Sequence, residues 1–560
     1  STMVREYKGA FSGEHGDGLV RSEWVAWQFG PRLTRAFEEI KSLFDPDGLM
    51  NPGKIVKPSK MDDARLFRYP PGYRTQPLQT ALDWSAWDVQ NDPVSEALTV
   101  PGSGGDPAHG FGKAVEMCNN NGHCRKFDAG TMCPSFRVTR DEEHLTRGRA
   151  NTLRLALSGQ IEGGLASDAV RDALDLCVSC KGCRRECPTG VDMAKMKIEF
   201  LHHYHQQHGI SVKDRLISYL PRYAHWGARL PWLFNLRNTM PAAAALSEKW
   251  FGFAAERSLP SWRSDTFLGD LMHPINADRS LAPQVRGDST KNLGEVVLFA
   301  DTFSNSFEPE IAHDALAVLE AAGYTVHLAL PSDGDRRPLC CGRTFLATGL
   351  VDQAKLEAKR TLAALMPHVE RGATIVGLEP SCLLSMRDEF LVMGLGPDAQ
   401  RLAASALLIE EFLAREHRAG RLHLRLKPLR EKRALIHGHC HQKAFDALAP
   451  AIEVLKLIPH LQVDVIDSSC CGMAGAFGYE RTHYDVSMKM AELSLLPAVR
   501  AADQDTLIVA DGTSCRHQIA DGTQPTGARH AMHAVRVLAR ALATSSPAAA
   551  RQSASRAARR

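Results

Sequence analysis

The sequence predicts a multidomain protein of mixed α+β and α/β class, in which a helical, cysteine-rich domain is followed by two α/β repeats. Three observations predict this architecture. Seven of the fourteen cysteines fall in two short clusters, and strands alternate with helices twice over beyond residue 290. The 560 residues also suffice for roughly three to five domains, each long enough to bury its own core.

The regions follow one another in a definite order. The first contains a helical stretch over Trp24–Leu43 and a turn at Asn51–Gly53, whereas the second is rich in Pro, Gly and Asp without sustained periodicity. We expect the end of an α/β domain over residues 1–58, a linker over 59–110, the helical cluster domain over 111–205, an aromatic-rich helical connector over 206–290, the repeats over 291–395 and 430–545, and a disordered tail over 546–560.

The two repeats share one plan, which is the strongest fold signal in the sequence. In each, a strand and a helix lead to a Cys-Cys-Gly tripeptide, and a later strand leads to a final cysteine. Strands alternating with helices at this spacing predict small α/β units with largely parallel sheets. The predicted strands are Glu295–Ala300 and Thr374–Leu378 in the first repeat, and Ala434–Ile436 and Leu507–Ala510 in the second.

Composition argues against several classes of protein. The formal charge of +3 arises from 67 basic and 64 acidic residues, so no overall field would draw the protein onto nucleic acid. No apolar run approaches the roughly 18 to 20 residues that span a bilayer, and no charged-then-apolar leader opens the sequence. We expect a cytoplasmic protein, with peripheral contact with the inner membrane as the alternative.

The cysteines are grouped in a way that indicates metal ligation rather than disulfide bonding. Four of them stand as adjacent pairs, Cys340-Cys341 and Cys470-Cys471, and adjacent cysteines make poor structural disulfides. In a reducing compartment such grouping favours iron–sulfur clusters or zinc, because thiolates are soft ligands for both.

The most specific motif is formed by Cys177, Cys180, Cys183 and Cys187, the last followed by Pro188. The spacing is that of bacterial ferredoxins, in which three thiolates hold one 4Fe-4S cube and the fourth cysteine reaches another. Zinc is the alternative, but zinc ligands usually come as two separated Cys-x2-Cys pairs. The spacing therefore favours a cluster.

Upstream, Cys118, Cys124 and Cys133 resemble the same motif, stretched and missing one cysteine. This predicts two clusters with exchanged fourth ligands, in which Cys133 completes the cube of the first three cysteines above. Cys118, Cys124 and Cys187 would then hold the second cluster, and three ordinary buried cysteines are the alternative. The second cluster could be 3Fe-4S, or its open corner could take an exogenous ligand, His123 or Asp128.

The repeats offer further sites. The second supplies four thiolates at strand ends or helix starts, where α/β units place ligands: Cys440, Cys470, Cys471 and Cys515. The first keeps three, Cys340, Cys341 and Cys382, but has Asp301, Thr302 and Phe303 where Cys440 would be matched, and is a candidate for a degenerate site. Zinc is a rival at the second site because four histidines crowd it: His437, His439, His441 and His517.

These motifs resemble motifs of known families, and they follow one another along this chain in the same order as in those families. The Cys440, Cys470-Cys471-Gly472 and Cys515 pattern resembles the paired cysteine-rich CCG domains of heterodisulfide reductase, glycolate oxidase and anaerobic glycerol-3-phosphate dehydrogenase iron–sulfur subunits. Residues 13–18, Gly-Glu-His-Gly-Asp-Gly, and Asn51–Ile55 resemble the C-terminal end of FAD-linked oxidases of the vanillyl-alcohol oxidase type. Nearly the whole chain thus resembles the fused FAD and iron–sulfur D-2-hydroxyacid dehydrogenases, especially the bacterial D-2-hydroxyglutarate dehydrogenases.

The resemblance implies roles in the first region, as the remnant of an FAD-linked oxidase C-terminal domain. It implies Glu14 as ligand of an active-site divalent metal, His15 as the base that abstracts the substrate hydroxyl proton, and Asn51 as a neighbour of the flavin. The family's FAD-binding domain and upstream His-rich metal motif are not found in this sequence. We therefore expect this chain alone to lack FAD, with that domain in a missing N-terminal part or a separate chain.

Two functions are in competition. In the first, the assembly oxidises a D-2-hydroxyacid, such as D-2-hydroxyglutarate, D-lactate or glycolate, and relays electrons from FAD through two or three 4Fe-4S clusters to a quinone or electron-transfer flavoprotein. In the second, a heterodisulfide-reductase-like CCG site performs thiol or disulfide chemistry itself. A zinc-stabilised scaffold is a third, simpler possibility. We expect a homo-oligomer and no nucleic-acid partner.

Overall fold

The computed structural model describes residues 2–11, 15–67, 69, 73–88, 106–127, 130–271, 284–285, 293–335, 337–524 and 527–543. The predicted tail over 546–560 lies outside these residues. Internal contacts divide the chain into two compact units. The first holds the described residues up to Arg74, and the second holds those from Thr75 onward.

The first unit is a short helical segment with little core. Its long helix confirms the helix predicted over Trp24–Leu43, and it bends at Gly30, where φ is 77° and Pro31 follows without a backbone N–H. After the helix, the Asp45 carboxylate accepts hydrogen bonds from the backbone N–H groups of Leu49 and Met50, both at 2.9 Å. Most of its large apolar side chains are exposed. Its elements are α1 (Thr2–Glu6), α2 (Gly18–Arg21), η1 (Ser22–Trp24), α3 (Val25–Phe44) and η2 (Ala64–Leu66).

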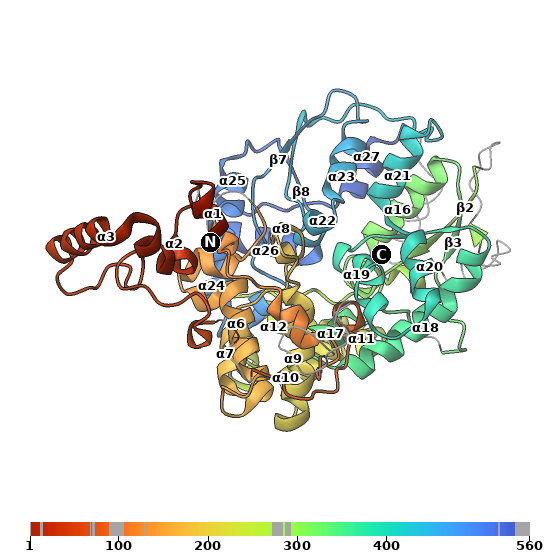
Figure 1. Ribbon diagram of the computed structural model, residues 1–560. Helices are drawn as coiled ribbons and strands as arrows, with labels where there is room; N and C mark the ends of the chain where they lie inside the picture. Colours follow the sequence, from red (N-terminus) through yellow and green to blue (C-terminus); the bar gives the residue numbers. More distant parts are fainter. Residues whose placement is uncertain are drawn as a thin grey trace. The chain divides into compact units, whose positions relative to one another are not determined.

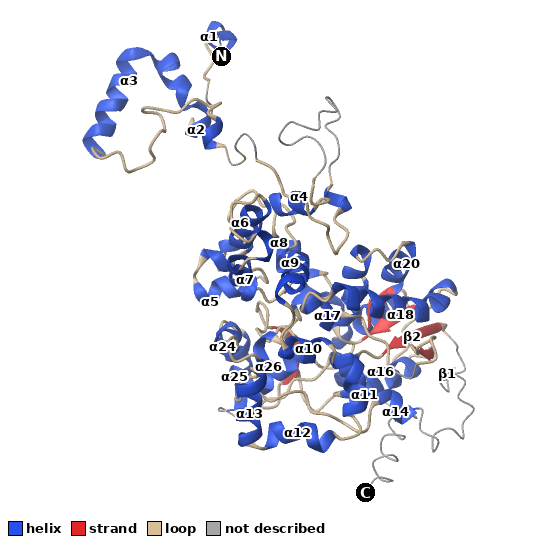
Figure 2. Cartoon of the chain, turned by 90° about the horizontal axis from the view of Figure 1, so that it is seen from below, coloured by secondary structure: helices blue, strands red, loops and turns tan. Residues whose placement is uncertain are grey.

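The second unit begins with the helical cluster domain, which Figure 2 draws as blue helices joined by tan loops. Its helices are short because the cysteine loops interrupt them. They are η3 (Ser85–Trp87), α4 (Phe111–Glu116), η4 (His123–Arg125), α5 (Pro134–Thr139), η5 (Glu142–His144), α6 (Thr146–Leu157), η6 (Gly164–Ala166), α7 (Asp168–Asp175), α8 (Gly182–Glu186) and α9 (Met193–His208).

Part of the predicted linker belongs to this domain, which corrects the expectation for residues 59–110. Leu82 and Trp84 are buried in the core of the cluster domain. The Trp84 indole Nε1–H and the Leu82 backbone N–H each donate to the buried Glu199 carboxylate at 2.9 Å. Residues 75–84 show no periodicity because individual contacts, such as those with Glu199 and the bond from the Gln76 N–H to the Leu157 carbonyl oxygen, fix them in place of a regular helix or strand.

The connector is helical, as predicted, and some of its aromatic side chains are packed. Trp262 contacts Tyr223 and Phe234 within the connector and Phe307 of the first repeat, with ring centroids 4.9 to 6.0 Å apart. Trp226, Trp232 and Trp250 are exposed. The helices are α10 (Val212–Ser218), α11 (Leu220–Gly227), α12 (Pro231–Thr239), α13 (Pro241–Phe251) and α14 (Phe267–Leu271).

The first repeat is a five-stranded sheet in the order β1-β3-β2-β4-β5, parallel apart from β1. Its last strand and helix lie beyond residue 395, where the sequence analysis ended the repeat. The strands are β1 (Gln284–Val285), β2 (Glu295–Phe299), β3 (Thr325–Leu328), β4 (Thr374–Gly377) and β5 (Ala406–Leu408). The helices are α15 (Thr302–Ser306), α16 (Pro309–Ala321), α17 (Arg343–Ala347), α18 (Val351–Glu370), α19 (Pro380–Met386), η8 (Glu389–Val392), α20 (Pro397–Ser405) and α21 (Ile409–Arg418).

The second repeat has a parallel sheet in the order β7-β6-β8, which matches β3-β2-β4 of the first. The strands predicted from the sequence are found within one residue of their ends in both repeats. The strands are β6 (Arg433–Ile436), β7 (Gln462–Val465) and β8 (Leu507–Val509). The helices are α22 (Cys440–Ala444), α23 (Leu448–Leu455), η9 (Phe477–Tyr479), α24 (Tyr484–Glu492), α25 (Leu495–Ala501), α26 (Thr513–Thr523) and α27 (Ala534–Ala541).

The two sheets share one hydrophobic core. Successive side chains of a strand point to opposite faces, so Val296 and Leu298 enter a different core from Val297 and Phe299. The shared core takes one face of each sheet together with α16, α21, α23 and α27, which Figure 1 shows grouped together. The other face of the first sheet packs on the cluster domain, and the other face of the second sheet packs around its cysteines.

Across the described residues, every helix is too short or too polar to cross a bilayer.

Candidate metal centres

The loop between α7 and α9 carries Cys177, Cys180, Cys183 and Cys187. The first three are buried, and Cys187 is half-buried at the end of α8. Ser179 and Lys181 take left-handed backbone conformations, with φ of 48° and 59°, which wind the loop tightly. A Cβ on Gly182 would stand 2.9 Å from the Met132 backbone nitrogen, so the loop packs directly on the segment that leads to Cys133.

Cys133 belongs to the same group of thiols. It is buried at the start of α5, and its Sγ accepts a hydrogen bond from the Thr146 backbone N–H at 3.2 Å. Burial raises the pKa of Cys133, and the charge of Cys177 raises it further. The Arg149 guanidinium lowers this pKa, but its effect is smaller than that of burial. Burial likewise raises the pKa of Cys183, with further contributions from Asp192, Cys133 and Cys177. The structure thus brings together the thiols that the sequence predicts for one cluster.

Cys124 lies close to both Cys118 and Cys133. Burial raises the pKa of Cys124 to about 11, and the other two thiols contribute to that rise. Of the two side chains considered for the open corner, His123 is exposed and Asp128 lies outside the described residues. Cys187 Sγ lies 3.3 Å from the Thr189 hydroxyl. For this second group the structure supports a pair, Cys118 and Cys124, with Cys187 at the edge of the same domain.

The four thiols of the second repeat form a hydrogen-bonded chain. Cys470 lies within hydrogen-bonding reach of both Cys440 and Cys471, and Cys515 lies within reach of Cys471. The hydrogen bond from Cys470 lowers the pKa of Cys440 to about 6 despite burial. Four buried thiols within hydrogen-bonding reach, two of them favoured as thiolates, are a donor set that fits an iron–sulfur cluster.

His437 keeps zinc as a rival at this site. Its Nδ1 lies 2.8 Å from the Ser468 hydroxyl, and its ring, after Cys470 and Cys515, helps to lower the pKa of Cys471. One nitrogen of His437 and the sulfur atoms of Cys471 and Cys515 lie within 4.8 Å of one another. Four thiolates, or three thiolates with one imidazole, suit zinc as well as iron.

The first repeat has the same loops but a different donor set. Asp301 caps α15 as His439 caps α22, so Thr302 stands where Cys440 stands. Cys341 is hydrogen-bonded to both Cys340 and Cys382. Burial and the neighbouring Glu379 raise the pKa of Asp301 to about 6. Three thiols beside two buried carboxyl groups lack the fourth thiolate of the second repeat, as the sequence predicts.

A cavity of about 1150 Å³ connects these sites. Thiols from the cluster loop and from both repeats line it, and several aromatic side chains of the connector and the repeats lie in the rest of its wall. Residues that bound it include Cys177, Cys382, Cys440, Cys471, Phe234 and Trp262. The cavity is large enough for a drug-sized organic molecule beside the thiols.

The cluster loop abuts the second repeat. The His441 ring Nε2 lies 3.1 Å from the Ser179 carbonyl oxygen, and the Ser469 hydroxyl donates to the Thr131 carbonyl at 2.9 Å. After burial, the charge of Cys440 contributes most to the raised pKa of Cys180. The thiols of the cluster domain and of the second repeat are therefore neighbours.

A buried ion-pair network that the sequence analysis missed joins the cluster loop to the first repeat. The ammonium group of Lys181, fully buried, lies 2.6 Å from both the Asp388 and the Glu389 carboxylates. Lys195 contacts Asp388 at 2.6 Å as well. Although burial raises it, the pKa of Asp388 is lowered overall by these two lysines. The only sequence signal was a lysine inside the cysteine motif.

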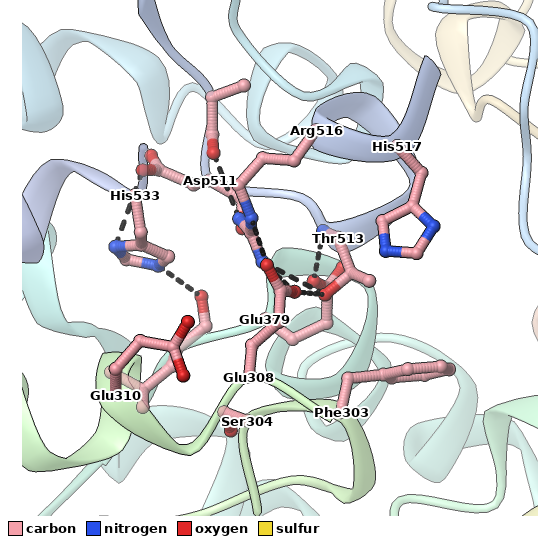
Figure 3. Close-up of polar contacts among 12 residues, drawn as sticks. Phe303, Ser304, Glu308, Glu310, Glu379, Asp511, Thr513, Arg516, His517 and His533 are labelled. Carbon is pink, nitrogen blue, oxygen red and sulfur yellow. Dashed lines mark hydrogen bonds and ion pairs between the residues drawn. The ribbon is translucent and has the colours of Figure 1, made fainter. Parts of the chain in front are cut away.

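A second network joins the two repeats. Figure 3 shows Glu308 and Glu379 of the first repeat meeting Arg516 and Thr513 of the second. The Arg516 guanidinium contacts the Glu308 carboxylate at 2.9 and 2.5 Å, and the Thr513 backbone N–H donates to Glu379 at 2.9 Å. These bonds fix the start of α26, on which Cys515 lies, against the first repeat.

In the first unit, His15 and Asn51 are exposed, and Glu14 lies outside the described residues. Asn51 has a φ of 44°, which the predicted turn requires. Their roles at a flavin therefore depend on the resemblance alone.

Two family descriptions match parts of the chain. Residues 1–55 match the C-terminal domain of FAD linked oxidases, and residues 114–191 match the 4Fe-4S dicluster domain. These matches confirm the relation to FAD-linked iron–sulfur proteins that the motifs predict, and they support 4Fe-4S clusters and FAD as the cofactors.

Several proteins resemble the chain over much of its length. It is 26% identical to D-2-hydroxyglutarate dehydrogenase of Escherichia coli over 95% of this chain and 52% of that protein. It is 26% identical to the enzyme of the same name from Pseudomonas putida over 93% of this chain and 50% of that protein. A subunit of the anaerobic glycerol-3-phosphate dehydrogenase of Escherichia coli is 28% identical over 51% of this chain and 66% of that protein. The chain spans about half the length of the D-2-hydroxyglutarate dehydrogenases it matches.

Proposed function

We propose that this chain is the electron-transfer part of an FAD-linked dehydrogenase that oxidises a D-2-hydroxyacid, with D-2-hydroxyglutarate as the first candidate substrate and D-lactate or glycolate as alternatives. One observation carries the proposal: the Cys180 loop of the cluster domain lies against the Cys440 site of the second repeat. Adjacent thiol groups on a rigid scaffold are what a relay of clusters requires.

In this proposal the residues of the chain hold and tune the clusters. Cys133, Cys177, Cys180 and Cys183 would bind one 4Fe-4S cluster, and Cys118, Cys124 and Cys187 a second. Cys440, Cys470, Cys471 and Cys515 of the second repeat, as a CCG domain, would bind a third. When bound, these groups accept and pass single electrons.

Hydrogen bonds to sulfur and nearby positive charge would raise the reduction potentials. The Thr146 N–H donates to Cys133, and the Gly472 N–H donates to Cys470 at 3.5 Å. Each of these N–H groups would stabilise added negative charge on the sulfur atom that it contacts.

The first unit would complete the flavin site of the assembly. We propose His15 as the base that takes the hydroxyl proton, Glu14 as ligand of a divalent metal and Asn51 as a neighbour of FAD, all by resemblance. The substrate loses two electrons and two protons and becomes a 2-oxoacid. The FAD-binding domain would come from elsewhere in the assembly, and a homo-oligomer is expected.

The electron acceptor would be a quinone, with electron-transfer flavoprotein as the alternative. The aromatic side chains in the cavity wall support a quinone, because a flat apolar molecule could approach the Cys440 and Cys471 thiols beside them. Two electrons and two protons would convert it to a quinol.

The test uses the full assembly, purified without oxygen. Adding D-2-hydroxyglutarate or D-lactate should bleach the flavin and cluster absorption bands together. A count of iron, acid-labile sulfide and EPR signals should give two or three clusters. If no 2-hydroxyacid bleaches the protein, or if iron and sulfide are absent, the proposal fails.

A heterodisulfide-reductase-like activity is the second candidate. The hydrogen-bonded Cys470 and Cys471 thiols beside a large cavity favour it, since a disulfide substrate could reach them. Turnover of a disulfide that survives loss of the Cys177 cluster would support this function, and unchanged activity in a Cys470→Ser variant would exclude it.

A further inference from the structure

Three titratable side chains meet at the junction of the two repeats, away from the cysteines. Glu410 lies in the first turn of α21 of the first repeat, Asp511 follows β8, and His533 caps α27 of the second. All three side chains are buried to 1% exposure or less. Two carboxyl groups and an imidazole are therefore buried together away from solvent. Their proximity needs an explanation, because burying an isolated charge costs free energy.

Glu410 is the least satisfied of the three. Within the described part of the chain, neither of its buried carboxylate oxygens has a hydrogen-bond partner. Glu410 Oε1 lies 3.5 Å from His533 Nδ1, and Asp511 Oδ1 lies 3.6 Å from the same nitrogen. Burial and the charge of Asp511 raise the pKa of Glu410. The carboxyl group thus faces another acid and a ring nitrogen.

Hydrogen bonds from neighbouring residues orient the side chains of His533 and Asp511, as is usual for metal ligands. His533 Nε2 lies 3.0 Å from the Leu378 carbonyl oxygen, a bond that fixes the proton on Nε2 and leaves Nδ1 with its lone pair. Asp511 accepts hydrogen bonds from the Gln442 side chain at 2.7 Å and from the Ala534 N–H at 2.9 Å. Figure 3 shows His533 and Asp511 side by side.

We propose that Glu410, Asp511 and His533 form a binding site for a divalent transition metal, with zinc as the best fit. Together they offer three ligand atoms, one each from His533 Nδ1 and from the carboxylates of Asp511 and Glu410, and they leave the fourth tetrahedral position to a water molecule. Zinc bonds of about 2.0 to 2.2 Å hold the ligand atoms of a tetrahedral site about 3.3 to 3.6 Å apart. The spacings of 3.5 and 3.6 Å around His533 Nδ1 match this range.

One existing contact would be replaced. The Val535 backbone N–H lies 3.1 Å from His533 Nδ1 and caps α27. The cap satisfies one backbone N–H, whereas a divalent cation neutralises two buried carboxylates at once. Binding of the cation is therefore favoured over the cap.

The site would fix the geometry of the second repeat's thiols without touching them. Asp511 is bonded to Gln442, and the Gln442 side chain accepts from the His439 N–H at 3.0 Å beside Cys440. Glu410 belongs to the other repeat, so a bound cation would tie the two repeats together at this point. The inference does not rest on the proposed electron-transfer function.

Metal analysis of the anaerobically purified chain tests the proposal. We expect one zinc per chain in addition to the iron. X-ray absorption at the zinc edge should give only nitrogen and oxygen ligands near 2.0 to 2.1 Å, because sulfur ligands would lie near 2.3 Å. Glu410→Gln should lose the zinc while iron and sulfide are retained, and a chelator should lower the Tm of the wild-type chain but not of the variant.

Glu411→Gln is the matched control, since Glu411 is the next residue of the same helix and is bonded to Arg387 and to the Leu408 N–H. It should retain the zinc. Zinc bound by sulfur would overturn the proposal and assign the metal to the cysteines. So would zinc absent even after anaerobic addition, or a Glu410→Gln variant that retains zinc. A variant with a raised Tm and no zinc in either protein would show a neutral, buried Glu410 instead.

Discussion

The two repeats have the same scaffold and different chemistry. Both begin with a central strand that ends in a capped helix, and in both the Gly N–H of the Cys-Cys-Gly turn donates to the first cysteine, at 3.3 Å in one and 3.5 Å in the other. Their sets of cysteines differ at one position, where Thr302 stands in place of Cys440. The first repeat thus has the same turn geometry with an incomplete set of thiols, and the backbone hydrogen bond to the first cysteine is common to both turns.

We expect the largest effect from substituting the first cysteine of each Cys-Cys-Gly turn, because the two turns should differ in whether a cluster is lost. Cys470→Ser should remove the iron of the second repeat and nearly all electron transfer to the acceptor, because a cluster loses one of four ligands. The equivalent Cys340→Ser should retain most activity. Iron content, EPR signals and acceptor reduction by the full assembly measure this, and equal losses in the two variants would contradict the comparison.

The repeats are also joined to the cluster domain in different ways. The first is joined by the buried pairs of Lys181 with Asp388 and Glu389. Lys181→Met should reduce the free energy of unfolding by about 3 to 5 kcal/mol, because it leaves buried carboxylates short of a partner. Denaturant unfolding measures the loss. Arg184→Met is the control: its half-exposed guanidinium lies 3.6 Å from Asp388, so its loss should be below about 1 kcal/mol.

The second repeat is joined by His483, whose Nε2 lies 2.8 Å from the Asp175 carboxylate of α7. Burial lowers its pKa, but hydrogen bonds with Asp175 and Glu480 prevail and raise the pKa of His483 to about 8, from an ordinary value of 6.5. This stabilisation is complete below pH 6.5 and is lost as the pH rises through 8. It amounts to about 1 to 2 kcal/mol.

Unfolding measured between about pH 6 and 9 should show this loss in the wild-type chain and a flatter profile in His483→Gln. Lys181→Met leaves the His483 contact with Asp175 in place, so this variant should keep the wild-type slope. A wild-type profile as flat as that of His483→Gln would show that the His483 contact is not formed.

The smallest expected change restores the missing ligand. Thr302→Cys would give the first repeat four thiols at the positions used by the second, and should raise the iron content with little change in stability. Ser306→Cys on the same helix is the control and should leave the iron content unaltered. Unchanged iron in Thr302→Cys would show that Asp301 and Glu379, rather than the missing thiol, exclude a cluster.

The sequence predicts much of the fold because its signals are local. Cysteine spacing indicates the cluster loop, and apolar strands at regular intervals indicate both sheets. The meeting of Cys133 with Cys177 and Cys183 was also predicted, from the analogy between two motifs. Each of these features depends on residues close together or on a repeated pattern.

Features that depend on single long-range contacts were missed. Lys181 and Asp388 are 207 residues apart, and neither lies in a pattern that indicates the other. The packing of Trp84 on Glu199 and the meeting of Glu410 with His533 are of the same kind. A buried polar partner is selected by the folded surface around it, which composition and periodicity do not describe.

The helical layer between the sheets has an evolutionary consequence. Because α16 and α21 pack with α23 and α27 in one core, deleting either repeat would expose the apolar side chains that the other contributes to this core. A duplicate that has lost a thiol therefore cannot be discarded as redundant. We expect selection to retain the first repeat because it covers part of the core of the second repeat. Its loops can change in sequence and acquire other ligands.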